Sequence, residues 1–274
     1  MSKEDKSEAN ASFWDELCGS QLAKTLGIKD DSKTSLKKFD DWYFKFYPYL
    51  DEHINFKNLR KKDVLEIGLG YGTVSQKIAL SGANYKGLDI ALGPVKMVNH
   101  RIMQNQLIGK AAQASILEPD FKDESFDVIV AIGCLHHTGD LKQAIQNCFR
   151  LLRPGGSLIF MVYYAYSYRR WTQTFATTLK YFISECKGDR GVVVSSTEKN
   201  RAGYDTNEAG DGAPHTDWIS KKSMAVLCKD FTEVSYKVEN MDALNGLIQI
   251  SREKLINSSI PQKLGLDLYV KATK

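Results

Sequence analysis

Val64-Leu65-Glu66-Ile67-Gly68-Leu69-Gly70-Tyr71-Gly72-Thr73 is the stretch that decides the fold of this 274-residue chain. Its first four residues are mostly aliphatic or β-branched, which indicates a buried parallel strand. Three glycines at alternate positions follow, and the amphipathic segment after them predicts a helix. A strand, a glycine loop and a helix in this order let the backbone approach a ligand closely. We therefore expect a ligand site at the end of this strand.

Two acidic residues narrow the choice of ligand. Glu66 lies just before the first glycine, and Asp89 ends the next expected strand, residues 85–89, where an acid commonly accepts from ribose hydroxyls. A dinucleotide site also needs a glycine three residues after its second one, but Thr73 stands there. Glu66 would repel a pyrophosphate and suits a cationic ligand. These residues favour S-adenosylmethionine, which carries an ammonium and a sulfonium and no phosphate, over NAD.

The composition excludes several classes of protein. A net charge of +4, from 37 basic and 33 acidic residues, is too mild to predict a nucleic-acid partner. The five cysteines include no C-x-x-C pair, so we expect neither a metal site nor a disulfide framework, as suits a reducing compartment. The polar N-terminus predicts no signal peptide, and no apolar run approaches membrane-spanning length. We expect a soluble cytoplasmic protein without a membrane partner.

Strand and helix patterns alternate through the centre of the chain. The expected strands are residues 64–67, 85–89, 110–114, 126–132, 157–163, 231–238 and 265–272, and the expected helices between them include 93–106, 141–152 and 221–228. This alternation predicts an α/β fold with a doubly wound, mostly parallel seven-stranded sheet of Rossmann-like type. Ligands of such sheets bind at the carboxyl ends of the strands.

Four parts of the chain follow from this pattern. We expect an N-terminal helical cap in 1–55, an S-adenosylmethionine-binding core in 56–163, an insertion acting as a substrate lid in 164–218, and the rest of the core sheet in 219–274. Residues 1 to about 12 are expected to be disordered. An aromatic stripe at helical spacing follows them, and Pro48 should end its helix.

Four motifs in the right order carry a family resemblance. They are residues 64–72, 87–90, 125–129 with 135–140, and 151–156. Together they resemble the class I S-adenosylmethionine-dependent methyltransferases of the small-molecule, type 11-like group.

The resemblance implies cofactor contacts at particular positions. They are Glu66, Gly68, Gly70, Gly72, Asp89, Ile90, Gln113, Ala114, Ser115 and Gly133. Gln113 departs from the family, which usually has an acid there to accept from the adenine amine. A glutamine oxygen can still accept that bond.

The chemistry that the resemblance implies is an in-line displacement at the sulfonium methyl. A hydroxyl acceptor would benefit from a general base, and histidine suits neutral pH. His136 and His137 follow the fourth expected strand, so one should point into the site. His137 is the preferred base and His215 the second choice. The alternative is that these histidines only pack or hydrogen-bond.

The expected acceptor contacts come from the cap and the insertion. They are Tyr43, Tyr47, Tyr163, Tyr166, Arg169 and Trp218. We expect methyl transfer to a small-molecule acceptor, with oxygen favoured and nitrogen or sulfur open. A non-catalytic S-adenosylmethionine-binding regulatory module is the alternative. The sequence leaves the oligomeric state open, with a homodimer as one arrangement.

Overall fold

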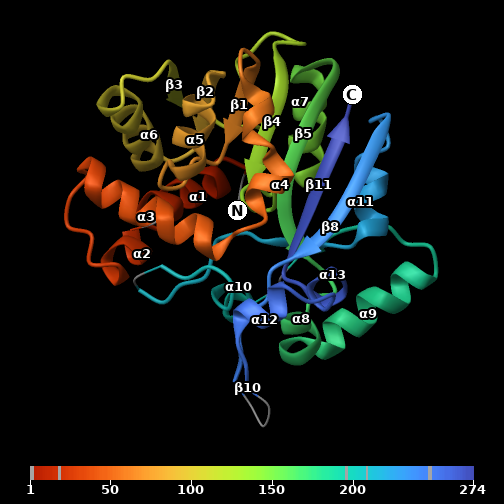
Figure 1. The fold of residues 1–274 in the computed structure, drawn as a ribbon. Coiled ribbons are helices and arrows are strands. Elements are labelled where there is room, and N and C mark those ends of the chain that lie inside the picture. Colours follow the sequence, from red (N-terminus) through yellow and green to blue (C-terminus); the bar gives the residue numbers. More distant parts are fainter. Residues whose placement is uncertain (1–2, 18–19, 195–196, 208, 246–248) are drawn as a thin grey trace.

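The central sheet of the protein has seven main strands. The structure is a computed structural model that describes residues 3–17, 20–194, 197–207, 209–245 and 249–274. The strand order is β3 (Gly109–Gln113), β2 (Asn84–Asp89), β1 (Asp63–Ile67), β4 (Phe126–Ile132), β5 (Leu152–Tyr164), β11 (Asp267–Thr273) and β8 (Glu233–Glu239) (Figure 1). β11 is antiparallel to both of its neighbours, and strands β1 to β5 pair in parallel. The predicted seven-stranded, mostly parallel sheet is confirmed.

Both faces of the sheet are buried under helices. These are α5 (Thr73–Leu80) and α6 (Leu92–Gln104) on one face, and α7 (Leu141–Leu151) and α11 (Lys221–Leu227) on the other. Because successive strand residues face opposite sides, Val64 belongs to the buried cluster that includes α5 and α6, whereas Leu65 belongs to the cluster that includes α7 and α11. This double burial explains the continuous apolar runs of the parallel strands.

The N-terminal segment is helical almost throughout. It forms α1 (Lys3–Leu17), α2 (Ser20–Thr25), α3 (Lys33–Phe46), α4 (Leu50–Ile54) and the short 3-10 helix η1 (Phe56–Leu59). The expected disorder up to residue 12 is therefore wrong from Lys3 onward, and residues 1 and 2 lie outside the described residues. Ser32 is the N-cap of α3, and its side chain accepts a hydrogen bond from the Ser35 amide. The helix ends shortly before Pro48, as predicted.

The insertion is folded and joins the sheet. It contains α8 (Tyr168–Gln173), α9 (Phe175–Cys186), β6 (Val193–Val194), α10 (Glu198–Ala202) and β7 (Asp217–Ile219). β7 pairs in parallel with the end of β5, and β6 pairs with β7. The expected boundary between residues 218 and 219 thus falls inside β7. The chain after β8 adds β9 (Leu244–Asn245), β10 (Gln249–Ile250), α12 (Arg252–Ile256) and α13 (Pro261–Leu264).

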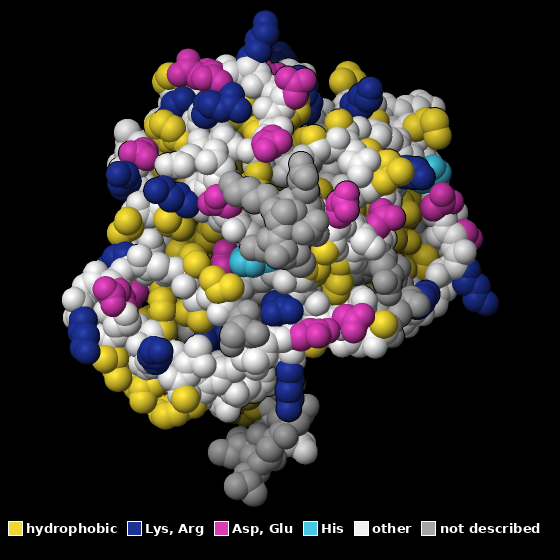
Figure 2. Space-filling model, turned by 180° about the vertical axis from the view of Figure 1, so that it is seen from behind, with side chains coloured by type: hydrophobic (Ala, Val, Ile, Leu, Met, Phe, Trp, Pro, Cys, Tyr) yellow, Lys and Arg dark blue, Asp and Glu magenta, His cyan; other side chains and the backbone are white. Residues whose placement is uncertain are grey.

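The cap and the insertion meet at one end of the sheet. In Figure 1, α1 to α3 and the insertion elements gather where the parallel strands finish, and β11 ends at the opposite side. On the face shown in Figure 2, basic and acidic side chains are interspersed among hydrophobic ones. None of the helices described is long and apolar enough to cross a bilayer.

Candidate active site

A cavity of about 680 Å³ lies at the carboxyl ends of the parallel strands. Its wall includes the glycine loop after β1, the end of β2, and the segments that follow β3 and β4. Helices α1 and α3 and the insertion supply the rest of the wall. This is the place where ligands of such sheets bind.

The glycine loop needs its glycines for two different reasons. Gly68 has φ of 75°, and a Cβ there would lie 2.4 Å from the Cβ of Cys134, because the ends of β1 and β4 approach closely. Gly70 has φ of 51° but faces open space, with no atom within 4 Å of such a Cβ. The loop backbone is therefore bare on the cavity side, where a ligand can approach it.

Asp89 links the glycine loop to β2. Its Oδ2 accepts from the Leu69 amide at 2.7 Å, and its Oδ1 accepts from the Ala91 amide at 2.9 Å. Burial raises the pKa of Asp89, while these backbone donors lower it. Each carboxylate oxygen retains a lone pair for a ligand hydroxyl, and the residue lines the cavity.

Glu66 is buried at the end of β1 and also lines the cavity. Its Oε2 accepts from the Tyr85 hydroxyl at 2.7 Å. Burial raises the pKa of Glu66 to about 8, so its carboxyl is largely protonated at neutral pH in the absence of a cation. A positively charged ligand beside it would lower this pKa.

The other expected cofactor positions divide into two groups. Ile90, Ala114, Ser115 and Gly133 line the cavity. Gly72 caps the N-terminus of α5 outside the lining, and Gln113 is an exposed residue whose Nε2 donates to the Ile90 carbonyl at 2.9 Å.

His137 is the histidine that faces the cavity. It belongs to the 3-10 helix η2 (Leu135–His137), and its Nδ1 lies 2.8 Å from the His215 carbonyl oxygen. A carbonyl only accepts, so Nδ1 carries the proton and Nε2 holds the lone pair. Within the described part of the chain, Nε2 has no hydrogen-bond partner. Burial lowers the pKa of His137, which keeps the ring neutral.

The other two histidines take supporting positions. His136 is fully buried, with its ring 4.0 Å from that of His137 and 4.2 Å from that of Tyr163. His215 lies outside the cavity lining and places its Nε2 3.0 Å from Asp217 Oδ1. Its backbone carbonyl orients His137, so its contribution comes from the main chain.

Comparison with known proteins finds similarity over part of the chain. A family model described as a methyltransferase domain matches residues 65–160. The ubiquinone biosynthesis O-methyltransferase of Coxiella burnetii is 32% identical over 154 residues, 50% of this chain and 64% of that protein. Its namesake from Pseudomonas putida is 30% identical over 114 residues, 41% of this chain and 47% of that protein. A solved S-adenosylmethionine-dependent methyltransferase from Methanosarcina mazei matches with a TM-score of 0.54 at 18% identity, over 83% of this chain and 97% of that one.

Residues 65–160 of this chain are similar to a methyltransferase domain. S-adenosylmethionine is the cofactor that the sequence predicts and that the name of the Methanosarcina mazei protein gives. The chain spans about half the length of the Pseudomonas relatives that it matches. The solved structure supports the fold alone, at its low identity.

The residues of the methyltransferase site fit this cofactor. Asp89 offers free lone pairs for ribose hydroxyls, and Glu66 offers a buried carboxyl to a positive charge. The bare backbone at Gly70 leaves room for the ligand. A dinucleotide would place its pyrophosphate near the acidic side chain of Glu66, which is a poor environment for a phosphate.

The charge state of Glu66 gives a pH prediction for cofactor binding. S-adenosylmethionine is positively charged and would bind better beside the ionised carboxylate, so binding below about pH 8 should release a proton. We expect affinity to rise between pH 6 and 8 and then to level off. Calorimetry in buffers of different ionisation enthalpy measures the proton released. Glu66→Gln should abolish both effects, and a proton count of zero in the unaltered protein would contradict the assignment.

The expected acceptor contacts lie at different depths. Tyr43 and Tyr47, from α3 and its C-terminal end, line the cavity. Tyr163 lies behind the wall, where its hydroxyl donates to both oxygens of Asp205 at 3.1 and 2.9 Å, and Trp218 packs behind Tyr163. Neither of these two lines the cavity.

The remaining two expected contacts are held elsewhere. Arg169 pairs with Asp242 and lies over the Tyr204 ring, with its guanidinium carbon 4.7 Å from the ring centroid. Tyr166 donates to Glu185 at 3.0 Å, in an aromatic cluster with α9. Both stabilise the insertion and lie outside the cavity lining.

Several wall residues were missed by the sequence analysis. Asn10 Nδ2 donates to the His137 carbonyl at 2.9 Å, and the Trp14 ring lies 4.6 Å from the His137 ring. Tyr269 of β11 is a third such residue, and of the three Trp14 was a visible aromatic signal. Tyr204 and Asp205 complete the wall, and they belong to the polar and aromatic end of the insertion that the sequence favours as a lid.

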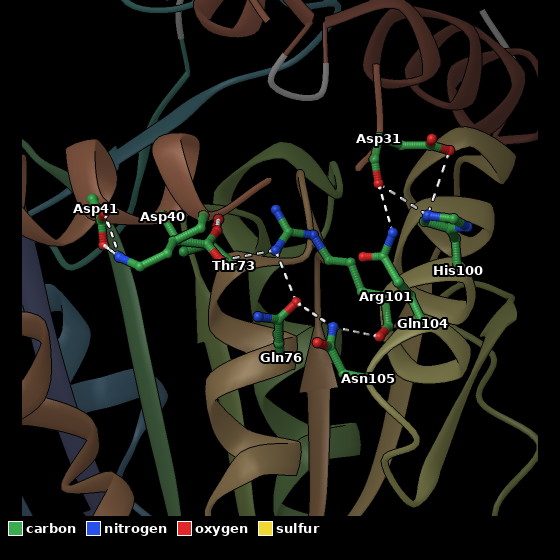
Figure 3. A network of polar contacts seen from close by, with 10 residues as sticks. Asp31, Asp40, Asp41, Thr73, Gln76, His100, Arg101, Gln104 and Asn105 are labelled. Carbon is green, nitrogen blue, oxygen red and sulfur yellow. Dashed lines mark hydrogen bonds and ion pairs between the residues drawn. The ribbon is translucent and has the colours of Figure 1, made fainter. Parts of the chain in front are cut away.

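A polar cluster fixes the cap beside the glycine loop (Figure 3). Asp40 of α3 accepts from Thr73 Oγ1 at 2.6 Å and from the guanidinium of Arg101 at 2.9 Å. Arg101 also donates to Gln76 at 3.1 Å and is fully buried. One carboxylate thus joins α3 to α5 and α6, and it keeps the tyrosines of α3 over the cavity.

Proposed function

We propose that this protein transfers the methyl group of S-adenosylmethionine to a hydroxyl group of a small-molecule acceptor. The observation that carries the proposal is His137 Nε2, which is buried on the wall of the cavity and makes no hydrogen bond within the described residues. Oxygen as the acceptor atom is further supported by the curated relatives, which are named O-methyltransferases.

The chain contributes a general base, a pocket that aligns the acceptor with the methyl group, and walls that exclude water. When bound, S-adenosylmethionine would supply an electrophilic methyl group to an acceptor oxygen, with the neutral sulfide as leaving group. His137 Nε2 takes the proton from the attacking hydroxyl, and such a base typically contributes about 10²- to 10⁴-fold in rate. The His215 carbonyl keeps Nε2 in the accepting state. The cap and insertion hold the reactants aligned.

The walls of the cavity define the class of acceptor. Besides Trp14, its aromatic residues are Phe39, Trp42, Tyr43, Tyr47, Tyr71, Tyr204 and Tyr269. Aromatic walls bind flat apolar bodies well, and a few polar groups fix orientation. We infer an acceptor with a flat apolar body and a hydroxyl that reaches His137. The N-terminal cap and the insertion both act as covers that select it, and the scattered cysteines favour a cytoplasmic location.

Methyl-deuterated S-adenosylmethionine tests this function. The protein is incubated with fractionated metabolite extracts, and mass spectrometry searches for products heavier by one labelled methyl group. We expect an oxygen-methylated product that is absent when His137→Gln replaces the unaltered protein. A product methylated on nitrogen or sulfur would overturn the assignment of the acceptor atom. Cofactor binding without any product would favour the regulatory module.

A further inference from the structure

We propose that Asp205 is a positioning residue that stabilises the protonated form of His137 during methyl transfer. The inference rests on the proposed function and extends it to the insertion. Asp205 Oδ2 lies 3.5 Å from His137 Nε2, and both side chains line the cavity. The side chains of His137 and Asp205 are 4% and 16% exposed, so water screens the pair weakly.

Asp205 is held in place by hydrogen bonds to its carboxylate and to its backbone. The Tyr163 hydroxyl donates to both of its oxygens. The Asp205 amide donates to the Arg201 carbonyl at 3.1 Å, and its carbonyl accepts from the Ala213 amide at 3.2 Å. Such anchoring gives the carboxylate a fixed direction toward His137, as a group that acts on a catalytic ring requires.

The geometry distinguishes the two states of His137. Before proton transfer, Nε2 carries a lone pair that an acceptor hydroxyl can meet, and 3.5 Å separates it from Asp205. After the proton moves from the hydroxyl to Nε2, the ring is positively charged and faces a carboxylate. The attraction arises only as the proton transfers, so it lowers the barrier without holding the resting state.

Some of the surrounding groups raise the pKa of His137 and others lower it. Burial lowers the pKa of His137 most strongly, and the charge of His215 lowers it further. Asp205, the hydrogen bond to the His215 carbonyl and Asp217 raise it. The ring of His136 packs against it, and Tyr163 lies beyond. For Asp205, burial raises the pKa, and His137, the Tyr163 hydroxyl and Arg169 lower it. Among the charged groups, Asp205 has the largest effect on the pKa of His137, so its removal should dominate the response.

Nitrogen-15 NMR of the imidazole rings tests the proposal without an acceptor. His137→Gln identifies the signals of His137 among the five histidines. In the unaltered protein we expect a proton on Nδ1 and a pKa below that of free histidine. In Asp205→Asn, which keeps the size of the side chain, the pKa of His137 should fall by a further one unit or so. Asp205→Glu should restore it in part, and Asp211→Asn, an exposed acid of the same insertion, should leave it unchanged.

Activity gives the second readout. The base must be neutral to act, so a lower pKa of His137 moves the acid limb of the kcat/KM profile to lower pH in Asp205→Asn. The plateau should also fall, by up to about tenfold, because a base of lower pKa takes the proton less readily in the transition state. If Asp205 has only a structural role, Asp205→Asn should lower the plateau of kcat/KM without shifting the pH of its acid limb.

Two results would overturn the proposal. One is a pKa of His137 that is unchanged or higher in Asp205→Asn, when melting temperature and cofactor affinity show a folded protein. The other is activity that survives His137→Gln but not Asp205→Asn, which would make Asp205 the base. If the unaltered protein binds S-adenosylmethionine but methylates nothing, the proposed function fails, while the NMR titration still decides whether Asp205 controls His137.

Discussion

Replacing His137 with glutamine is expected to lower kcat for methyl transfer by about 10²- to 10⁴-fold, the usual contribution of a general base. Glutamine is close to histidine in size and can still donate toward the His215 carbonyl, but it cannot take a proton at neutral pH. Because His137 lies on the acceptor side of the wall, the affinity for S-adenosylmethionine should change little. Single-turnover rates and calorimetric titrations measure the two effects separately.

The outcome separates base catalysis from positioning alone. A rate within about threefold of the original, in a variant that melts normally, would show that the cavity acts only by aligning the reactants. A parallel loss of cofactor affinity would instead place His137 in contact with the cofactor. Either result contradicts the role proposed for Nε2.

Replacing Asp89 with alanine should weaken S-adenosylmethionine binding by at least about tenfold. The ribose hydroxyls lose an ionised acceptor, and bonds to charged groups contribute about 1.5–3 kcal/mol each. The Leu69 and Ala91 amides also lose their partner, so the glycine loop is no longer tied to β2. Asp89→Asn should weaken binding as well, because an amide nitrogen would face one of these two donors. Calorimetry gives the affinities.

Asp127 provides the matched control for Asp89. It also accepts from a backbone amide, that of Asp63 at 2.8 Å, but it lies at the opposite end of the sheet and pairs with Arg153. Asp127→Asn should cost some stability and leave cofactor affinity unchanged. If folded Asp89→Ala binds as well as the unaltered protein, the ribose lies elsewhere.

The parallel sheet could be predicted because its signals are local. β4 occupies residues 126–132 as expected, since its apolar run is buried on both faces. β5 begins at Leu152, earlier than the expected residue 157, because Leu152 already pairs with Phe126 of β4, and the Gly155 amide then donates to the Lys274 carbonyl. This contact joins residues far apart in the sequence and leaves no local pattern.

The cofactor contacts could be predicted from the glycine loop, whereas most of the acceptor contacts could not. Gly68 and Asp89 belong to a motif whose spacing reflects backbone geometry. Asp205 reaches His137 only because α10 and β7 fold the insertion back over the sheet. Tyr166 was expected at the acceptor, yet it packs with α9, since composition cannot tell which side of a polar and aromatic segment faces inward.

Calorimetric titration of the unaltered protein with S-adenosylmethionine, S-adenosylhomocysteine and NAD tests the central claim most directly. Glu66 and Asp89 on the wall of the cavity predict that S-adenosylmethionine and its demethylated product both bind, and that NAD does not. Tight binding of NAD without binding of S-adenosylmethionine would contradict the assignment of this cavity and the methyl transfer built on it.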